Sequence, residues 1–294
     1  MAFHKAERKK GKLRLMIYGG PGFGKTFSSI LIASGMGNNI GLIGTERGSE
    51  ELYGDIASYQ VSNITPPYDP QKFIEELNDA EKQKFDVVII DSFSHAWMGE
   101  GGVLDIHNAF SKSQKNPFSA WKDATPFQNK LMDRILSYPG HIICCVRAKT
   151  GYTVGNDNKI TKKTTLDPIQ RPGTEYEFRI VFEMSDDHYA TAVKDIGIFG
   201  STPFVPTKET GKKILDWLET GSSIEELPMS QNQSEEIRNM KEKIDCTPVQ
   251  GKLIADWFKT LNFDQAQKVI VRLREADIFT FSDYESLREE LKND

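Results

Sequence analysis

Runs of apolar residues alternate with amphipathic stretches along the first half of the chain. Short runs rich in β-branched residues, without polar alternation, are typical of strands that are buried on both faces of a parallel sheet. Such runs occupy residues 13–18, 40–45, 85–91 and 141–147. Apolar residues recur at helical spacing between them, over residues 25–36, 71–83 and 120–137. This alternation predicts an α/β fold with a mostly parallel, doubly wound sheet.

The pattern changes after residue 147. Residues 150–167 are polar and carry a turn signal at Gly155–Asn158 between two Thr-rich arms, which predicts a hairpin. Two further runs, 176–184 and 189–196, are joined by a short polar turn and predict an antiparallel pair. The expected core therefore has a mostly parallel sheet with antiparallel strands added at its edge.

The C-terminal part of the chain has a different organisation. A helix predicted over residues 207–218 is followed by a segment rich in Ser, Gln and Asn, which is typical of a linker. Beyond it, several stretches with helical spacing predict a small helical module. We therefore expect an α/β domain over residues 1–220, a linker over 221–234 and a helical C-terminal module over 235–294.

Composition narrows the class of protein. No apolar run of the 294-residue chain approaches the ~20 residues of a membrane span, so no membrane association is expected. Cys144, Cys145 and Cys246 lack metal-ligand spacing, which favours reduced thiols in a cytoplasmic protein. The formal net charge of −5 argues against a protein that coats nucleic acid, but leaves room for a local basic site.

The segment GGPGFGKT follows the first predicted strand and opens the first predicted helix. It fits the phosphate-loop pattern G-x-x-x-x-G-K-[ST], in which glycines let backbone N–H groups face the phosphates. Lys25 would reach the β- and γ-phosphates and the Thr26 hydroxyl would ligate Mg²⁺. This motif predicts ATP and Mg²⁺ as cofactors. The expected cofactor-binding residues are Gly19, Gly20, Pro21, Gly22, Phe23, Gly24, Lys25, Thr26 and Phe27.

Two carboxylates at strand ends have the spacing of a phosphoryl-transfer site. Asp91 ends the strand FDVVIID, where a P-loop protein needs a second Mg²⁺ ligand beside Thr26. Ser92 follows it, so the glutamate that many AAA+ ATPases carry at this next position is missing. Glu46, just past the strand 40–45, is the candidate base that orients the attacking water. Arg147 ends the strand nearby and is a candidate sensor of the γ-phosphate.

These motifs in this order resemble the core of RecA-type recombinases, with strand-end T-E at Glu46 and D-S at Asp91. More closely, the series GGPGFGKT, TERGS, VVIIDSFSHAW, CCVRAK, QRPGTEYEF and AVKD is similar to the phage-encoded RecA-like ATPases of an AAA-domain family. The similarity covers about residues 12–220. It implies a RecA-like core, catalysis by Glu46, a role for Lys194 at the ATP of a neighbouring subunit, and hence a homo-oligomer. A phage origin implies the cytoplasm of a bacterial host.

A local excess of basic residues lies around the predicted hairpin. Residues 147–171 hold six basic against two acidic side chains. RecA-type proteins keep a mobile DNA-binding loop at this position, so the resemblance implies single-stranded DNA as a partner; a solvated hairpin is the alternative. The candidate DNA-binding residues are Lys149, Lys159, Lys162, Lys163 and Arg171. The basic N-terminal residues, Lys5 to Arg14, are a second candidate phosphate contact, a subunit-docking arm or a solvated tail.

The expected function is an ATP-dependent, single-stranded-DNA-binding ATPase of recombination or annealing. The first alternative is an ATP-dependent loader or remodeller of phage or host replication and recombination proteins, which would be bound through residues 235–294. A small-molecule kinase is the second alternative, although the chain lacks an Arg-rich lid. Stimulation of ATP hydrolysis by DNA distinguishes the first interpretation from the other two.

Overall fold

The computed structural model describes residues 8–113, 117–154, 160–220, 231–261, 263–276 and 278–291. It divides into two compact units. The larger unit is Gly11–Leu218, and the smaller one contains the residues from Glu219 onward. Each unit is described by itself.

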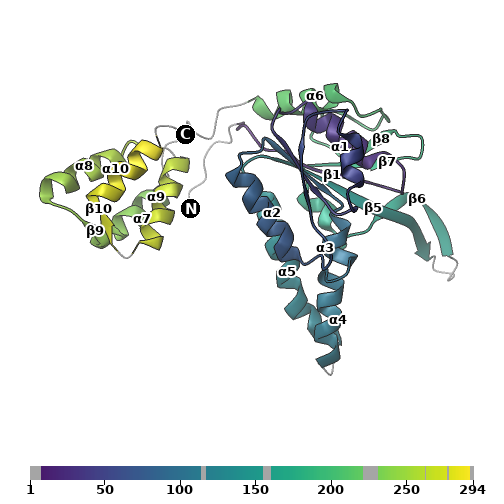
Figure 1. The fold of residues 1–294 in the computed structure, drawn as a ribbon, viewed down its shortest axis with the longest axis horizontal. Helices are drawn as coiled ribbons and strands as arrows, with labels where there is room; N and C mark the ends of the chain where they lie inside the picture. The colour runs from purple at the N-terminus through teal and green to yellow at the C-terminus, as the bar shows by residue number, and fades with distance from the viewer. Residues whose placement is uncertain are drawn as a thin grey trace. The chain divides into compact units, whose positions relative to one another are not determined.

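A mixed sheet forms the centre of the larger unit (Figure 1). Its strands follow the order β3-β2-β4-β5-β1-β7-β8, and all neighbours are parallel except β7 and β8. The bounds are β1 Arg14–Gly19, β2 Ile40–Gly44, β3 Gln60–Asn63, β4 Val87–Asp91, β5 His141–Val154, β7 Ile180–Met184 and β8 Ala190–Lys194. β6, Ile160–Pro168, pairs antiparallel with the distal half of β5.

Helices cover both faces of this sheet. Successive residues of β1 alternate between two hydrophobic clusters, with Met16 in one and Leu15 and Ile17 in the other, as the period of a strand requires. α1 (Lys25–Ser34) and α6 (Lys208–Glu219) pack in the second cluster. α2 (Pro70–Lys82) and α5 (Ala120–Ser137) pack in the first. The doubly wound arrangement follows from this two-sided burial, and Figure 1 shows both layers.

The predicted fold class is confirmed, with differences in several elements. The strand expected over 176–184 begins at Ile180, because Thr174–Glu177 form a 3₁₀ helix, η3. The strand expected over 141–147 continues to Val154, where it forms one arm of the predicted hairpin. The predicted turn at 155–158 lies outside the described residues. β3 was not predicted, because it is a short edge strand whose residues are mostly exposed.

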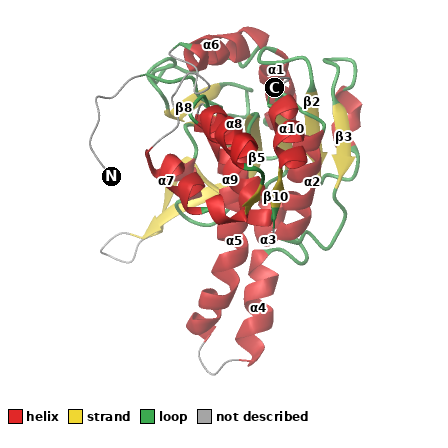
Figure 2. Ribbon diagram, turned by 90° about the vertical axis from the view of Figure 1, so that its left-hand side faces the viewer, coloured by secondary structure: helices red, strands yellow, loops and turns green. Residues whose placement is uncertain are grey.

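Further elements that the sequence pattern did not reveal lie between β4 and α5. α3 (Ser94–Met98) and α4 (Val103–Ser113) follow β4, and η2 (Pro117–Ser119) precedes α5. α4 and α5 run side by side beyond the sheet, as Figures 1 and 2 both show. The short helix η1, Ser49–Tyr53, follows β2.

The smaller unit is helical, as predicted. Its helices are α7 (Gln231–Asn239), α8 (Pro248–Phe258), α9 (Phe263–Glu275) and α10 (Phe281–Glu290), with the 3₁₀ turn η5 (Lys241–Lys243). Two short strands that were not predicted, β9 (Ile244–Asp245) and β10 (Phe279–Thr280), pair in parallel. Thr247 and Thr280 form capping boxes that begin α8 and α10. Ile254, Val269 and Leu287 are among the residues of its own hydrophobic core.

Candidate nucleotide-binding site

The phosphate loop connects β1 to α1. Gly22 (φ 76°) and Gly24 (φ 85°) adopt the left-handed conformation that a side chain disfavours, and a Cβ on Gly20 would lie 2.8 Å from the ring of Phe23. The Lys25 Nζ donates to the Gly20 carbonyl oxygen (2.7 Å). The loop therefore closes around its own lysine at the N-terminus of α1, where an anion is favoured.

The two predicted Mg²⁺ ligands lie in contact. The Thr26 hydroxyl donates to the Asp91 carboxylate, which stands at the end of β4 and is only 3% exposed. Burial raises the pKa of Asp91 to about 6, although the hydrogen bond from Thr26 opposes this rise. Burial also lowers the pKa of Lys25, against the attraction of nearby Asp91. A hydroxyl beside a carboxylate supplies oxygen ligands of the kind that Mg²⁺ prefers, so Thr26 and Asp91 would hold the ion.

Glu46, just after β2, and Arg147, the last residue of β5 that pairs with β1, form a bidentate ion pair. Arg147 donates from Nε to Oε1 (3.1 Å) and from Nη2 to both carboxylate oxygens (2.7 and 2.6 Å). Both side chains are partly exposed, at 30% for Glu46 and 42% for Arg147, so water reaches them. Both oxygens of the candidate base are thus occupied in this structure, and the candidate γ-phosphate sensor is the group that occupies them.

A polar network ties the end of β2 to the end of β4 beside this ion pair. Ser92 N–H donates to the Thr45 hydroxyl oxygen (2.7 Å), and His95 Nδ1 lies 2.6 Å from the same oxygen. The His95 ring stacks on Tyr68, and burial together with the nearby Arg147 lowers its pKa. A cavity of about 440 Å³ opens here. Its lining residues are Thr45, Glu46, Arg47, Pro66, Tyr68, His95, Met98, Gly99, Glu100 and Arg147.

Comparison with known proteins identifies the family. Residues 11–210 match the family model described as an AAA domain. The chain belongs to this AAA-domain family. A solved structure, that of the RadB recombinase, is similar at 13% sequence identity over 68% of this chain and 84% of that chain, with a TM-score of 0.35. No curated protein matches the chain.

One buried side chain of the AAA domain was not singled out in the sequence. Glu50 of η1 is 0% exposed, and its carboxylate accepts hydrogen bonds from the backbone N–H groups of Glu46 and Gly48. The adjacent Glu51 is exposed, so residue type alone could not distinguish the two. His188 was also missed; its ring lies 3.3 Å from where a Cβ on Gly24 would stand.

Lys194 lies apart from the phosphate loop. It ends the edge strand β8, where its Nζ donates to the Tyr176 carbonyl oxygen (2.6 Å). Among the described residues it makes no contact with Lys25 or Glu46. Its predicted action on ATP therefore stays a prediction about a second copy of the chain. Phe27, predicted to bind the cofactor, is 44% exposed on α1 and meets the ring of Tyr53 edge-on.

The candidate DNA-binding residues that the structure describes lie in two places, the β5–β6 hairpin and the loop after β6. Lys149 lies on β5, and Lys162 and Lys163 lie on β6, within the hairpin. Lys159 lies outside the described residues. Arg171 lies in the loop after β6, where it donates to Asn129 Oδ1 of α5 (3.1 Å), so the structure groups it with α5 and not with the hairpin.

The suggestion that Arg14 belongs to an outward basic arm is wrong. Arg14 is 5% exposed within β1, and its guanidinium donates to the carbonyl oxygens of Leu13 (2.7 Å), Gly140 (2.9 Å) and Leu136 (3.0 Å) and to that of Tyr138. The residue therefore fastens β1 to the end of α5. No helix among the described residues has the length and apolar character to cross a membrane.

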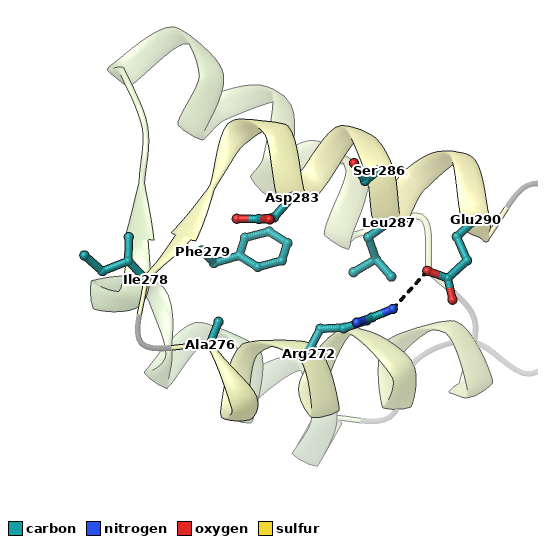
Figure 3. Close-up of a pocket in the computed structure, with 8 residues that line it drawn as sticks. All are labelled: Arg272, Ala276, Ile278, Phe279, Asp283, Ser286, Leu287 and Glu290. Atoms are coloured by element: carbon teal, nitrogen blue, oxygen red, sulfur yellow. Dashed lines mark hydrogen bonds and ion pairs between the residues drawn. The ribbon is translucent and has the colours of Figure 1, made fainter.

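The smaller unit has a cavity of its own, of about 350 Å³, between α9 and α10. Arg272 faces Glu290 across it in an ion pair (3.3 Å), and Phe279 and Leu287 contribute apolar surface (Figure 3). None of the residues predicted from the sequence to hold ATP or Mg²⁺ lines this cavity. This cavity is therefore no part of the predicted nucleotide site.

Proposed function

We propose that the AAA domain binds ATP with Mg²⁺ and hydrolyses it. The contact between Thr26 and Asp91 carries the proposal, because it joins a phosphate-loop hydroxyl to a buried strand-end carboxylate, and these two groups would hold Mg²⁺ against the β- and γ-phosphates. Lys25 would exchange the Gly20 carbonyl for phosphate oxygens. The glycine conformations and the start of α1 support an anion at the same point.

Hydrolysis would use Glu46 as the group that orients and deprotonates the attacking water. In the ion pair both oxygens of Glu46 accept hydrogen bonds from Arg147, and we propose that Arg147 transfers from Glu46 to the γ-phosphate when ATP is bound. This transfer would free the base and place a cation on the phosphate oxygens in a single step. Glu46 follows β2 and Arg147 lies on β5, the two neighbours of β4, and their ion pair places both side chains together, which supports their acting on the same phosphate.

We further propose that the ATPase works on single-stranded DNA in recombination or annealing, as a homo-oligomer, in the setting of a phage in its bacterial host. The basic hairpin supports DNA as the ligand, and β5 supports its coupling to ATP, because this strand continues from the nucleotide site into the hairpin. Lys194, distant from the phosphate loop of its own chain, would reach the ATP of a neighbour.

A loader or remodeller of replication or recombination proteins is the second candidate function. The cavity between α9 and α10 favours it, because apolar side chains flanked by Arg272 and Glu290 suit a peptide segment of a partner protein (Figure 3). The two proposals differ in the ligand that stimulates hydrolysis.

The test measures ATP turnover of the full chain with and without single-stranded DNA. We expect turnover that requires Mg²⁺ and rises with DNA. Lys25→Ala should abolish it, and Glu46→Gln should bind ATP but hydrolyse it ~10²–10⁴-fold more slowly. Lys82→Ala, which removes an exposed lysine of α2, is the matched control for Lys25. Unaltered turnover in Lys25→Ala contradicts the ATPase assignment, and turnover indifferent to DNA favours the loader.

A further inference from the structure

The turn that carries Glu46 has an uncommon backbone. Arg47 (φ 58°) and Gly48 (φ 87°) are consecutive residues in the left-handed region, and the first of them has a side chain. A non-glycine residue in this region costs free energy and persists only where the surroundings hold it. The feature that holds the turn is therefore of functional interest.

The Glu50 carboxylate closes this turn from inside the protein. One oxygen accepts from the Glu46 N–H (2.7 Å), and the other accepts from the Gly48 N–H (3.1 Å). Glu50 is fully buried and has no ion pair with a basic side chain among the described residues. Its burial is thus compensated by these backbone donors, and such bonds to a charged acceptor are strong.

The strand before the turn leaves space for this carboxylate. A Cβ at Gly44, the last residue of β2, would stand 2.7 Å from the Glu50 carboxyl carbon. On its other side Glu50 is fixed through its own carbonyl oxygen, which accepts from the Tyr59 hydroxyl (2.6 Å). The carboxylate is therefore held in one place, and the backbone of Glu46 is held with it.

We propose that Glu50 is a positioning residue for ATP hydrolysis, which sets the Glu46 carboxylate at the distance from the γ-phosphate that the attacking water requires. Thr45, tied to Ser92, fixes the turn from the β4 side, and Glu50 fixes it from the η1 side. When Arg147 leaves Glu46, Glu50 is the group that keeps the base in place. The inference rests on the proposed function, because it assigns Glu46 as the base.

The test is Glu50→Gln in the full chain. The amide oxygen can still accept from Glu46 N–H, but the NH₂ group then faces the Gly48 N–H and loosens the turn. We expect kcat to fall about 10- to 100-fold, with the affinity for a fluorescent ATP analogue unchanged, because a small misplacement of a reacting group has such an effect. Glu51→Gln, the same change at the exposed neighbour, should keep the wild-type kcat.

A double-mutant cycle separates positioning from a structural role. If Glu50 acts through Glu46, then Glu50→Gln should cause no further loss of kcat in the Glu46→Gln background. Additive losses, a loss of nucleotide affinity, or a wild-type kcat in Glu50→Gln while Glu46→Gln is slow, would overturn the inference alone. A wild-type kcat in Glu46→Gln would instead overturn the proposed base, and the inference with it.

A second variant covers the case in which Glu50→Gln does not fold. Gly48→Ala keeps the Glu50 carboxylate and both N–H donors, but places a Cβ on a left-handed residue with no atom near it. It should lower kcat, leave nucleotide affinity unchanged, and have no effect in the Glu46→Gln background. Gly200→Ala, at another open left-handed glycine (φ 68°), is its control and should keep the wild-type kcat. Equal kcat values in the two glycine variants would contradict the inference.

Discussion

Burial of the charged Asp91 side chain lowers the free energy of unfolding of the nucleotide-free protein. Its carboxylate is almost fully buried, and its pKa of about 6 lies above the ordinary value of 3.8. Below pH 4 the carboxyl is protonated in both folded and unfolded chains. Between pH 4 and 6 the folded chain keeps a proton that the unfolded chain has released, so the free energy of unfolding falls as pH rises. Above pH 6 the whole penalty, about 2–3 kcal/mol, is present.

Asp91→Asn should therefore stabilise the nucleotide-free protein at pH 7.5 while weakening its use of Mg²⁺. Asn has nearly the shape of the protonated side chain and can still accept from Thr26. In thermal unfolding with a chelator we expect Tm to rise by several degrees at pH 7.5. The gain should be smaller at pH 4.5, where wild-type Asp91 is mostly protonated. A gain of equal size at both pH values, or a lower Tm at pH 7.5, would show that burial does not penalise this charge.

At the residue scale, the sequence predicts a position best where the local chain geometry determines it. Lys25 and Thr26 belong to a loop whose conformation follows from its glycines and from the strand and helix around it, so their placement at one point could be foreseen. Glu50 could not, because it and Glu51 differ only in which of them tertiary packing turns inward. Arg14 misled for the same reason: its charge suggested an exposed arm, but most of its carbonyl partners lie at the end of α5 and just after it, far away in the sequence.

At the element scale, Arg14 joins β1 to the end of α5. Arg14→Ala would leave the buried carbonyl oxygens of Leu13 and Tyr138 without this donor, which should lower the free energy of unfolding by about 3 kcal/mol. The expected fall in Tm is about 6–12 °C. Lys12→Ala, which removes an exposed cation two residues earlier, is the control for charge. A Tm equal to that of the control would show that these hydrogen bonds contribute little.

The hairpin is the element most open to a DNA-binding test. Replacing Lys159, Lys162 and Lys163 with Ala should reduce the log–log slope of single-strand binding against salt by about 2, at ~0.7 for each lost phosphate contact. ATP turnover without DNA should change little.

The control for this hairpin variant replaces Lys82, Lys122 and Lys130, exposed lysines of α2 and α5, so the net charge changes equally. An unchanged slope in the hairpin variant would make the hairpin a bystander. A matching loss of DNA-free turnover would make it part of the active site.

The helices and strands with a long, regular pattern of apolar residues were the ones that the sequence predicted. Buried strands such as Val87–Asp91 were found because every residue is apolar or at the strand end. β3 is a mostly exposed edge strand, and β9 and β10 have two residues each. The apolar pattern of these three strands therefore does not distinguish them from loops. α4 was missed although the helical spacing of its apolar residues is no weaker than that of α5, against which it packs.

At the scale of the whole molecule, the position of Lys194 makes assembly testable. Neither Lys25→Ala nor Lys194→Ala chains should hydrolyse ATP efficiently alone, because one lacks the phosphate-loop cation and the other the cation offered to a neighbour. Mixed oligomers contain interfaces that pair an intact Lys25 with an intact Lys194, so mixing should restore part of the turnover. A trans cation can contribute ~10³–10⁵ in rate, so the recovery should be measurable.

The mixing experiment requires proof that the chains exchange. Gel filtration of differently tagged chains with a non-hydrolysable ATP analogue supplies it. Verified mixed oligomers without recovery, or a fully active monomer, would remove Lys194 from the proposed mechanism. The sequence alone could not decide this question, because how copies meet depends on surfaces whose pairing no single-chain pattern records.

Two residues of β5, Cys145 and Arg147, lie beside three parts of the site. Cys145 pairs with Asp91, Arg147 pairs with Gly19 of the phosphate loop, and the Arg147 side chain holds Glu46. The strand then leaves the sheet as the first arm of the hairpin. A ligand that displaces the hairpin would thus perturb Asp91, the phosphate loop and Glu46 together. Coupling between two binding sites is thermodynamically reciprocal. Whatever factor DNA applies to the affinity for ATP, ATP must apply to the affinity for DNA.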